Sequence, residues 1–177
     1  MIDRLSQLAR RPVTAGAALL LSVCLAAFAV VRVTSGDDGE LPSSDDSSAT
    51  VARDFALAVT TFDYRDAQAS IDRVLALGNA GFEEEFRTAM GADFLTNLEA
   101  AQSISTGRVV SGPTAQRSND GRTSYLAIVD QTIQSAVPTT TAADGSAPAP
   151  AQPQLLHLGM LVTVDTDTGK VTAVEVL

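Results

Sequence analysis

The stretch TTFDYRDAQASIDRVLALGNAGFEEEF, residues 60–86, decides how the rest of the chain is interpreted. It places eight acidic and basic residues among aromatic and aliphatic ones. That mixture is compatible with the floor of an active site or with the packing of a domain that catalyses nothing. The remaining sequence separates these two interpretations.

The charges of this stretch favour packing. Its bases are interleaved with its acids, a pattern typical of a solvated helix face whose ion pairs each contribute little. The alternative is general acid/base chemistry by paired carboxylates, Asp63 with Asp66 or Asp72 with Glu83. Residues 63–66 mark a bend, since they fall between two apolar helical patterns.

Apolar periodicity predicts three helices. The first follows Ser47 or Ser48, either of which can cap it, and its apolar residues recur at intervals of four, four and three: Val51, Phe55, Val59 and Phe62. The second covers residues 67–77 and is terminated by Gly78-Asn79. The third begins near Gly81 and keeps an i, i+4 rhythm through Phe82, Phe86, Met90, Phe94 and Leu98.

After residue 103 the period changes to two. Four antiparallel strands are predicted in GRVVSG, TSYLAIVDQTI, LLHLGMLVTVD and KVTAVEVL, with turns at Asp120-Gly121 and Thr168-Gly169. Residues 138–153, rich in Pro, Ala and Thr, are predicted to form an exposed mobile loop. Helices followed by strands indicate an α+β domain over residues 49–177.

An uncharged run precedes this domain. PVTAGAALLLSVCLAAFAVV, within residues 12–32, is long enough as a helix to cross the roughly 30 Å core of a bilayer. Arg10 and Arg11 precede it and Arg32 ends it, so the positive-inside rule predicts a cytoplasmic segment 1–11 and an exported C-terminal part, a single-pass protein of the inner membrane.

A cleavable signal peptide is the alternative, because Ala27-Phe28-Ala29 matches an A-x-A cleavage pattern. Both interpretations export the rest of the chain. Residues 33–48, with Gly, Ser, Pro and acids and little to bury, are predicted to be a disordered acidic linker.

Composition excludes several classes of protein. The net charge of −9, from 12 bases and 21 acids, gives no basic footprint for a nucleic-acid partner. Cys24 is the only cysteine and His157 the only histidine, so the usual Cys/His metal sites cannot form. No phosphate-binding glycine loop or nucleophile elbow is present either. We therefore predict no cofactor, no metal and no catalytic residues.

Two residues on predicted strands remain as candidates for chemistry. His157 is expected to point outward, opposite the apolar face that contains Leu158 and Met160. Asp130 shares a strand face with Leu126 and Ile128, and it would be a buried carboxylate with a raised pKa if that face pointed into the domain. Its place near the strand end favours exposure.

The order of these features resembles the Mce-associated membrane proteins of actinobacteria. The resemblance is carried by ARDFALAVTTFDYRDAQASIDRVLALGNAGFEEEF, YLAIVDQTI and LVTVDTDTGKVTAVEVL, and its most specific part is Phe62-Asp63-Tyr64 followed by Gly81-Phe82. This chain lacks the Trp-containing last strand common in that family. Relative to that family, its Pro/Ala-rich loop resembles an inserted segment.

The resemblance implies a cone-shaped domain of three helices on a curved four-stranded sheet, similar to the nuclear-transport-factor-two-like fold and to periplasmic domains of type IV secretion subunits. It implies a non-catalytic accessory role, stabilising or assembling Mce lipid or sterol import complexes, with the subunits of that complex, and possibly itself, as partners. Within such a cone we expect a structural role for Phe55, Phe62, Asp63, Tyr64, Phe82 and Phe86. The alternatives are a small-molecule-binding or isomerase-like enzyme on the same cone, and a scaffold subunit of a secretion apparatus.

Overall fold

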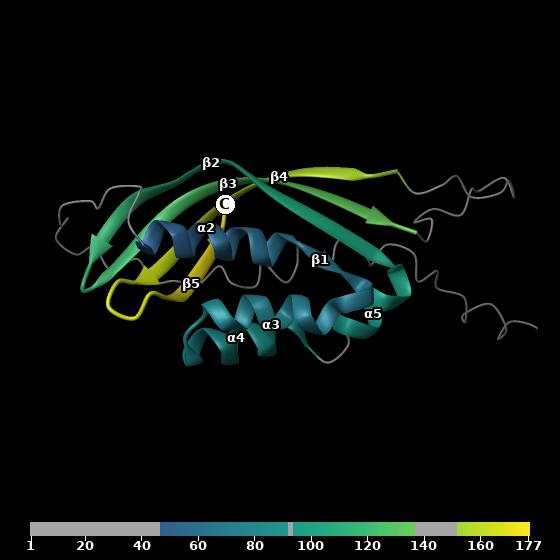
Figure 1. The fold of residues 1–177 in the computed structure, drawn as a ribbon, viewed down its shortest axis with the longest axis horizontal. Coiled ribbons are helices and arrows are strands. Elements are labelled where there is room, and N and C mark those ends of the chain that lie inside the picture. The colour runs from purple at the N-terminus through teal and green to yellow at the C-terminus, as the bar shows by residue number, and fades with distance from the viewer. Residues whose placement is uncertain (1–46, 92–93, 137–151) are drawn as a thin grey trace, which may run out of the picture.

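Helices and an antiparallel sheet make up the computed structural model, which describes residues 47–91, 94–136 and 152–177 (Figure 1). In chain order the elements are α2 (Ser47–Thr60), β1 (Phe62–Asp63), the 3-10 helix η1 (Tyr64–Asp66), α3 (Ala67–Leu77), α4 (Ala80–Met90), α5 (Phe94–Ala101), β2 (Ser103–Asn119), β3 (Arg122–Ser135), β4 (Gln154–Asp165) and β5 (Lys170–Val176). The sheet order is β1-β2-β3-β4-β5. The predicted α+β class is confirmed, and the described part of residues 49–177 has one more α-helix and one more strand than predicted for it.

Several predictions fall on residues that the structure does not describe: the segment 1–11, the membrane helix 12–32 with Arg10, Arg11 and Arg32, most of the linker 33–48 and most of the loop 138–153. No helix in the described ranges is both long enough and apolar enough to span a bilayer. Ser47 and Ser48 are the first two residues of α2 that the structure describes, and Ser48 is buried.

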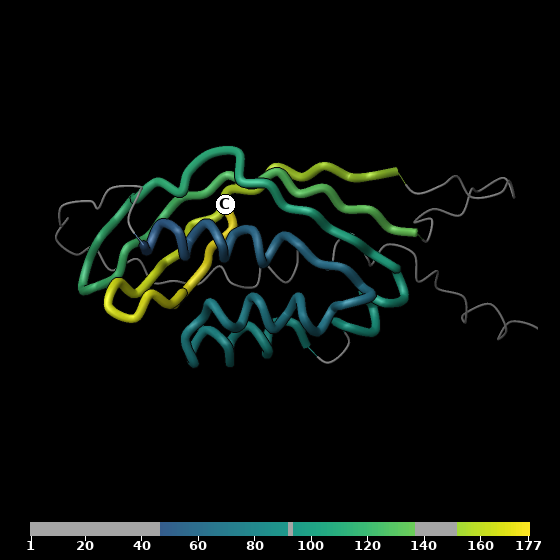
Figure 2. The backbone as a smooth tube through the Cα atoms, viewed as in Figure 1, coloured from purple at the N-terminus to yellow at the C-terminus, as the bar shows by residue number. Residues whose placement is uncertain are grey.

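Helix α2 lies in the curl of the sheet, with strands β2 to β5 around it (Figures 1 and 2). Ala52, Phe55 and Ala56 are completely buried there. The predicted helix face is therefore correct at Phe55, whereas Val51 and Val59 are half-buried at the margin of the core. Small alanine side chains allow the helix to approach the sheet closely, and the spacing of larger residues does not reveal that contact.

The predicted first helix ends earlier than its periodicity suggests. Phe62 lies in β1, where it pairs with Ser105 of β2, and is not the last apolar position of the helix. Thr60 and Thr61 are β-branched and favour extended backbone, which explains the change of conformation. The two-residue strand β1 thus joins the helical layer to the edge of the sheet.

The predicted third helix is two helices. Helix α4 ends at Met90, and Gly91 has φ 65° and ψ 170°, a conformation essentially restricted to glycine. Helix α5 resumes at Phe94. The i, i+4 rhythm across this break follows an apolar groove that both helices line, so it indicated a shared environment and not one continuous helix.

Strand β2 is 17 residues long, far longer than the predicted GRVVSG segment. Its pairing with β3 shifts register three times between Val109 and Arg117, and such bulges bend and twist a sheet. At the end of the hairpin Asp120 and Gly121 have φ 48° and 69°, as required in the predicted two-residue turn. The bulges give the sheet the curvature that encloses α2.

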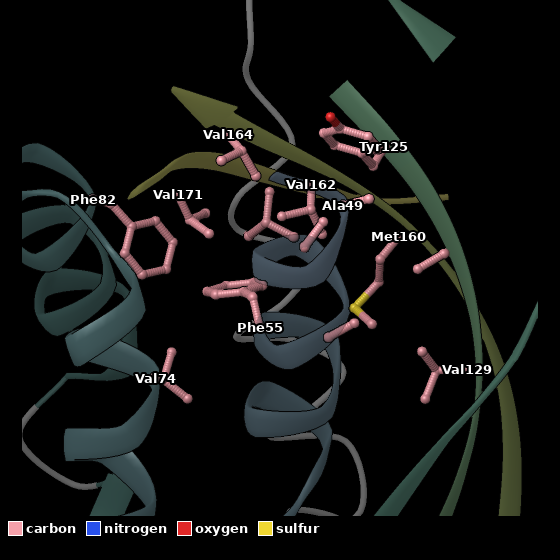
Figure 3. Close-up of a cluster of buried hydrophobic side chains, with 14 of the residues drawn as sticks. Ala49, Phe55, Val74, Phe82, Tyr125, Val129, Met160, Val162, Val164 and Val171 are labelled. Carbon is pink, nitrogen blue, oxygen red and sulfur yellow. The ribbon is translucent and has the colours of Figure 1, made fainter. Parts of the chain in front are cut away.

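Two apolar clusters hold the layers together. The main one gathers side chains from α2, α3, α4 and the concave face of β3, β4 and β5 around Phe55 (Figure 3). Alternation along β4 places Met160, Val162 and Val164 in it with no exposed surface. The smaller cluster consists of Phe62, Ala67 and Leu98, with three half-buried residues against it: Tyr64, Phe94 and Leu95.

Candidate functional site

The bend after β1 is held by an ion pair. Asp63 caps η1, since its Oδ1 accepts a hydrogen bond from the backbone N–H of Arg65 at 2.9 Å. The Arg65 guanidinium donates to both carboxylate oxygens, from Nε to Oδ1 at 2.8 Å and from Nη2 to Oδ2. These hydrogen bonds lower the pKa of Asp63 to about 2. A carboxylate so engaged is a poor proton acceptor near neutral pH, unlike the general base considered above.

Two further acids of the opening stretch, Asp72 and Asp66, lie on or beside α3. Asp72 is exposed and accepts a hydrogen bond from Nε2 of Gln68 on the same helix, at 2.8 Å. Asp66 provides the N-cap position of α3 without a side-chain bond to the backbone. Within the described residues, no group of three His, Cys, Asp or Glu side chains is placed to hold a metal ion.

The predicted structural residues divide between the two clusters. Phe55 and Phe82 are buried in the main cluster, and Phe86 is half-buried against it, stacked on Phe82 with ring centroids 5.6 Å apart. Phe62 and Tyr64 belong to the smaller cluster beside the bend. The Arg65 guanidinium lies 5.9 Å from the centre of the Tyr64 ring.

The structure contains a buried polar network that the sequence pattern did not predict. Gln131, 1% exposed, donates from Nε2 to Oγ of Ser105 at 2.8 Å and to the carbonyl of Thr60 at 3.3 Å. Ser105 in turn donates to the same carbonyl at 2.7 Å. The network fastens the end of α2 to β2 and β3. Its only sequence signal is a glutamine on the inward face of β3, between Val129 and Ile133.

Asp130 does not lie inside the domain, in line with the exposure that its place near the strand end favoured. The concave face of β3 carries Tyr125, Ala127 and Val129, so Asp130 lies on the outer face. There its Oδ1 is 2.6 Å from Nδ1 of His157, and its Oδ2 accepts from Arg108 at 3.1 Å. The hydrogen bond with His157 is the main reason that the pKa of Asp130 lies below its ordinary value, the opposite of a raised pKa. His157 is exposed, as predicted.

An apolar groove opens between the helices and β5. Its volume is about 50 Å³, and Ser70 is the one polar side chain among the residues that line it: Ala58, Val59, Phe62, Ala67, Ser70, Ile71, Val74, Phe86, Ala89, Met90, Phe94, Leu98 and Val174. None of these side chains is ionisable. The groove is far below the roughly 300 Å³ of an ordinary small-molecule site.

No protein-family model and no curated protein sequence matches the chain. Solved structures do match. The periplasmic domain of DotI is 15% identical with a TM-score of 0.51, over 78% of this chain and 99% of that one. CagV, a VirB8 homolog of the type IV secretion system of Helicobacter pylori, is 10% identical with a TM-score of 0.53, over 74% and 97%. An IcmL-like type IV secretion system protein of Legionella pneumophila is 13% identical with a TM-score of 0.54, over 78% and 94%.

This similarity establishes the fold. The chain has the cone fold of VirB8-like periplasmic domains. This is one of the two kinds of domain that the predicted cone was expected to resemble. At such low identity no residue role transfers from these proteins. None of the three comparisons adds support for an Mce-associated protein specifically.

Proposed function

We propose that this chain is a non-catalytic, membrane-tethered scaffold subunit of a secretion assembly in the cell envelope. The observation that carries the proposal is the match of the fold to nearly the whole of the DotI periplasmic domain and of CagV. The membrane tether is the predicted helix 12–32, with the domain on the outer side.

The apolar groove weighs against the enzyme alternative. An isomerase-like site on this cone requires a carboxylate inside a sizeable cavity, whereas Asp130 lies on the outer sheet face and the groove has no titratable lining. An Mce lipid-import role is the other variant of the proposal. It has the resemblance of the segment around Phe62-Asp63-Tyr64 in its favour, and the fold comparison favours the secretion scaffold over it.

Affinity capture from detergent-solubilised membranes separates these variants. We expect the full chain to recover secretion subunits identified by mass spectrometry. The matched control retains residues 1–46 and replaces the domain with an unrelated exported protein, so that proteins held by the anchor alone are subtracted. Recovery of Mce transporter subunits would move the proposal to lipid import, and a monomer without partners would overturn both.

Orientation is tested separately. Protease added to intact spheroplasts is expected to digest the C-terminal domain and leave a small protected N-terminal fragment. Protection of the domain until the membrane is permeabilised would contradict the proposed topology.

A further inference from the structure

The apolar groove between the helices and β5 is narrow inside and open on one side. Its lining includes the buried side chains of Ile71, Val74 and Val174, and half-buried residues such as Phe86 and Met90 border it. The enclosed part measures about 50 Å³, whereas the whole space between the walls, with the part open to solvent included, measures about 650 Å³. A thin ligand can therefore lie along the groove, but a compact one cannot be enclosed by it.

The walls of the groove restrict the kind of occupant. A partner helix is about 10 Å across, so its backbone stays outside an enclosed space of this size. An extended peptide needs a wall with backbone donors and acceptors. Ser70, Ile71 and Val74 lie inside α3, where the backbone groups bond within the helix. A hydrocarbon chain is thin and requires no hydrogen bonds, so it matches these walls best.

One polar side chain connects the apolar lining to a positive charge. Ser70 is 5% exposed, and its Oγ donates to the carbonyl of Asp66 at 3.2 Å and accepts from Nη2 of Arg73 at 2.9 Å. Arg73 is exposed, and it takes part in none of the ion pairs found among the described residues. The guanidinium thus lies beside the groove and is available to an anionic group.

We propose that the groove binds the chain of a fatty acid, with its carboxylate on Arg73. An arginine binds a carboxylate through two parallel hydrogen bonds, which gives the ligand a fixed orientation. The lining residues of α3 extend from Ala67 to Val74, a rise of about 10 Å along which the chain lies. A single narrow groove takes one chain, so it favours a fatty acid over a phospholipid with two. This binding site goes beyond the scaffold function and does not depend on it.

Photocrosslinking in membranes tests the site in the full chain. The probe is palmitic acid with a diazirine within its chain and a terminal alkyne, and mass spectrometry identifies the tryptic peptides that carry it. We expect label on peptides 74–87 and 88–108, which contain the lining residues of α4 and α5. The apolar run 12–32, predicted to lie in the bilayer, provides the internal reference for probe uptake.

A blocking variant shows whether the groove holds the probe. Ala89→Phe places a large side chain in the lining and is expected to lower the label on peptide 74–87 several-fold relative to the reference. The matched control is Ala100→Phe, at an exposed position of α5 outside the lining, and it should be labelled like the parent. Neither substitution alters peptide 74–87. If Ala89→Phe fails to fold, Ala58→Leu narrows the groove from α2 instead.

The carboxylate contact is tested on peptide 88–108. Arg73→Gln should lower its label several-fold, and Arg73→Lys should retain part of it because the charge remains. The methyl ester of the same probe lacks the charge, so it should label the parent and Arg73→Gln equally. A loss of label through misfolding would affect the acid and the ester alike. Phosphatidylcholine with the same photoreactive chain is expected to leave the groove unlabelled.

Three results would overturn the proposal. Equal label in Ala89→Phe and Ala100→Phe would place the probe elsewhere, and equal label by the phospholipid would exclude a single-chain ligand. Absence of label from the parent, together with loss of captured subunits from Ala89→Phe, would assign the groove to a partner protein. The parent chain can bind the fatty acid whether or not it recovers secretion subunits, so the site and the scaffold function succeed or fail separately.

Discussion

Phe55 and Phe82 meet edge to face, with ring centroids 5.3 Å apart and ring planes at 80° (Figure 3). Phe55 comes from the helix inside the sheet and Phe82 from α4, so this contact joins the two layers of the domain. Both rings are almost fully buried. Aromatic pairs in this geometry contribute beyond the area they bury.

Phe82→Ala is expected to lower the free energy of unfolding by about 3–5 kcal/mol, because it leaves a cavity beside Phe55. Phe86→Ala is the matched control, since Phe86 is half-buried one helical turn away, and should cost less than half as much. Urea denaturation followed by circular dichroism measures both. Equal losses for the two variants would contradict the assigned position of Phe82 at the junction.

Gly107→Ala tests the close approach of β2 to α2. An added Cβ would overlap Oγ1 of Thr60 and lie 2.8 Å from its Cβ, so we expect a loss of about 1–3 kcal/mol from overpacking. Gly81→Ala is the control, because a Cβ there meets nothing closer than 3.6 Å and alanine favours the helix. In thermal unfolding, the midpoint temperature should fall below that of the parent for Gly107→Ala and rise slightly above it for Gly81→Ala. A Gly107→Ala variant as stable as the parent would show that α2 and β2 are not so close.

The titration of Asp130 reports its contact with His157. His157→Ala is expected to raise the pKa of Asp130 toward its ordinary value, and more than Arg108→Ala does, because the histidine hydrogen bond is the larger influence. Carboxyl carbon shifts in NMR spectra measure this.

The lowered pKa of Asp130 also determines how the stability of the fold changes with pH. Since the folded-state pKa of Asp130 is lowered, its ionised form stabilises the fold above the unfolded-state pKa of about 3.9. That contribution is lost as pH falls through the folded-state pKa, so His157→Ala should be less sensitive to pH in this acidic range. An unchanged Asp130 titration in His157→Ala would contradict the pairing.

Shortening the β3–β4 connection is expected to leave the thermal stability of the fold unchanged or slightly higher. Replacing residues 136–151 with Asn-Gly joins Ser135 to Gln152 in the register that Ile133 and Gln154 define. A shorter loop costs less entropy to close, a gain of about 2 kcal/mol or less. Differential scanning calorimetry should show the same single transition at an equal or slightly higher temperature. The control replaces the same residues with a Gly/Ser sequence of equal length, and a lost transition in both would mean that these residues support the core.

Elements with long, uniform periodicity were predictable. Helix α3 matches the predicted residues 67–77, and the alternation of β4 correctly identified the face of Met160. The break at Gly91 was not visible, because the apolar rhythm continues across it. Strand β1 has only two residues, and its one signal is a partner more than 40 residues away at Ser105.

The faces of β3 show why the candidate site was harder to predict. Leu126 and Ile128 make one face apolar, and Tyr125, Ala127 and Val129 do the same for the other. Periodicity alone gives no reason to choose between them, so the side on which Asp130 lies depends on the partner layer. The Gln131 network likewise exists only once Thr60 and Ser105 are brought to it by distant elements.

The position of α2 has a consequence for the order of folding. Its residues Ala52 and Phe55 share a core with Val171 and Val174, which are the last buried residues of the described chain. Contacts this distant in sequence form slowly. During synthesis the apolar face of α2 therefore stays exposed until β5 has been made, and a chain truncated before Lys170 would leave that face accessible to chaperones and proteases.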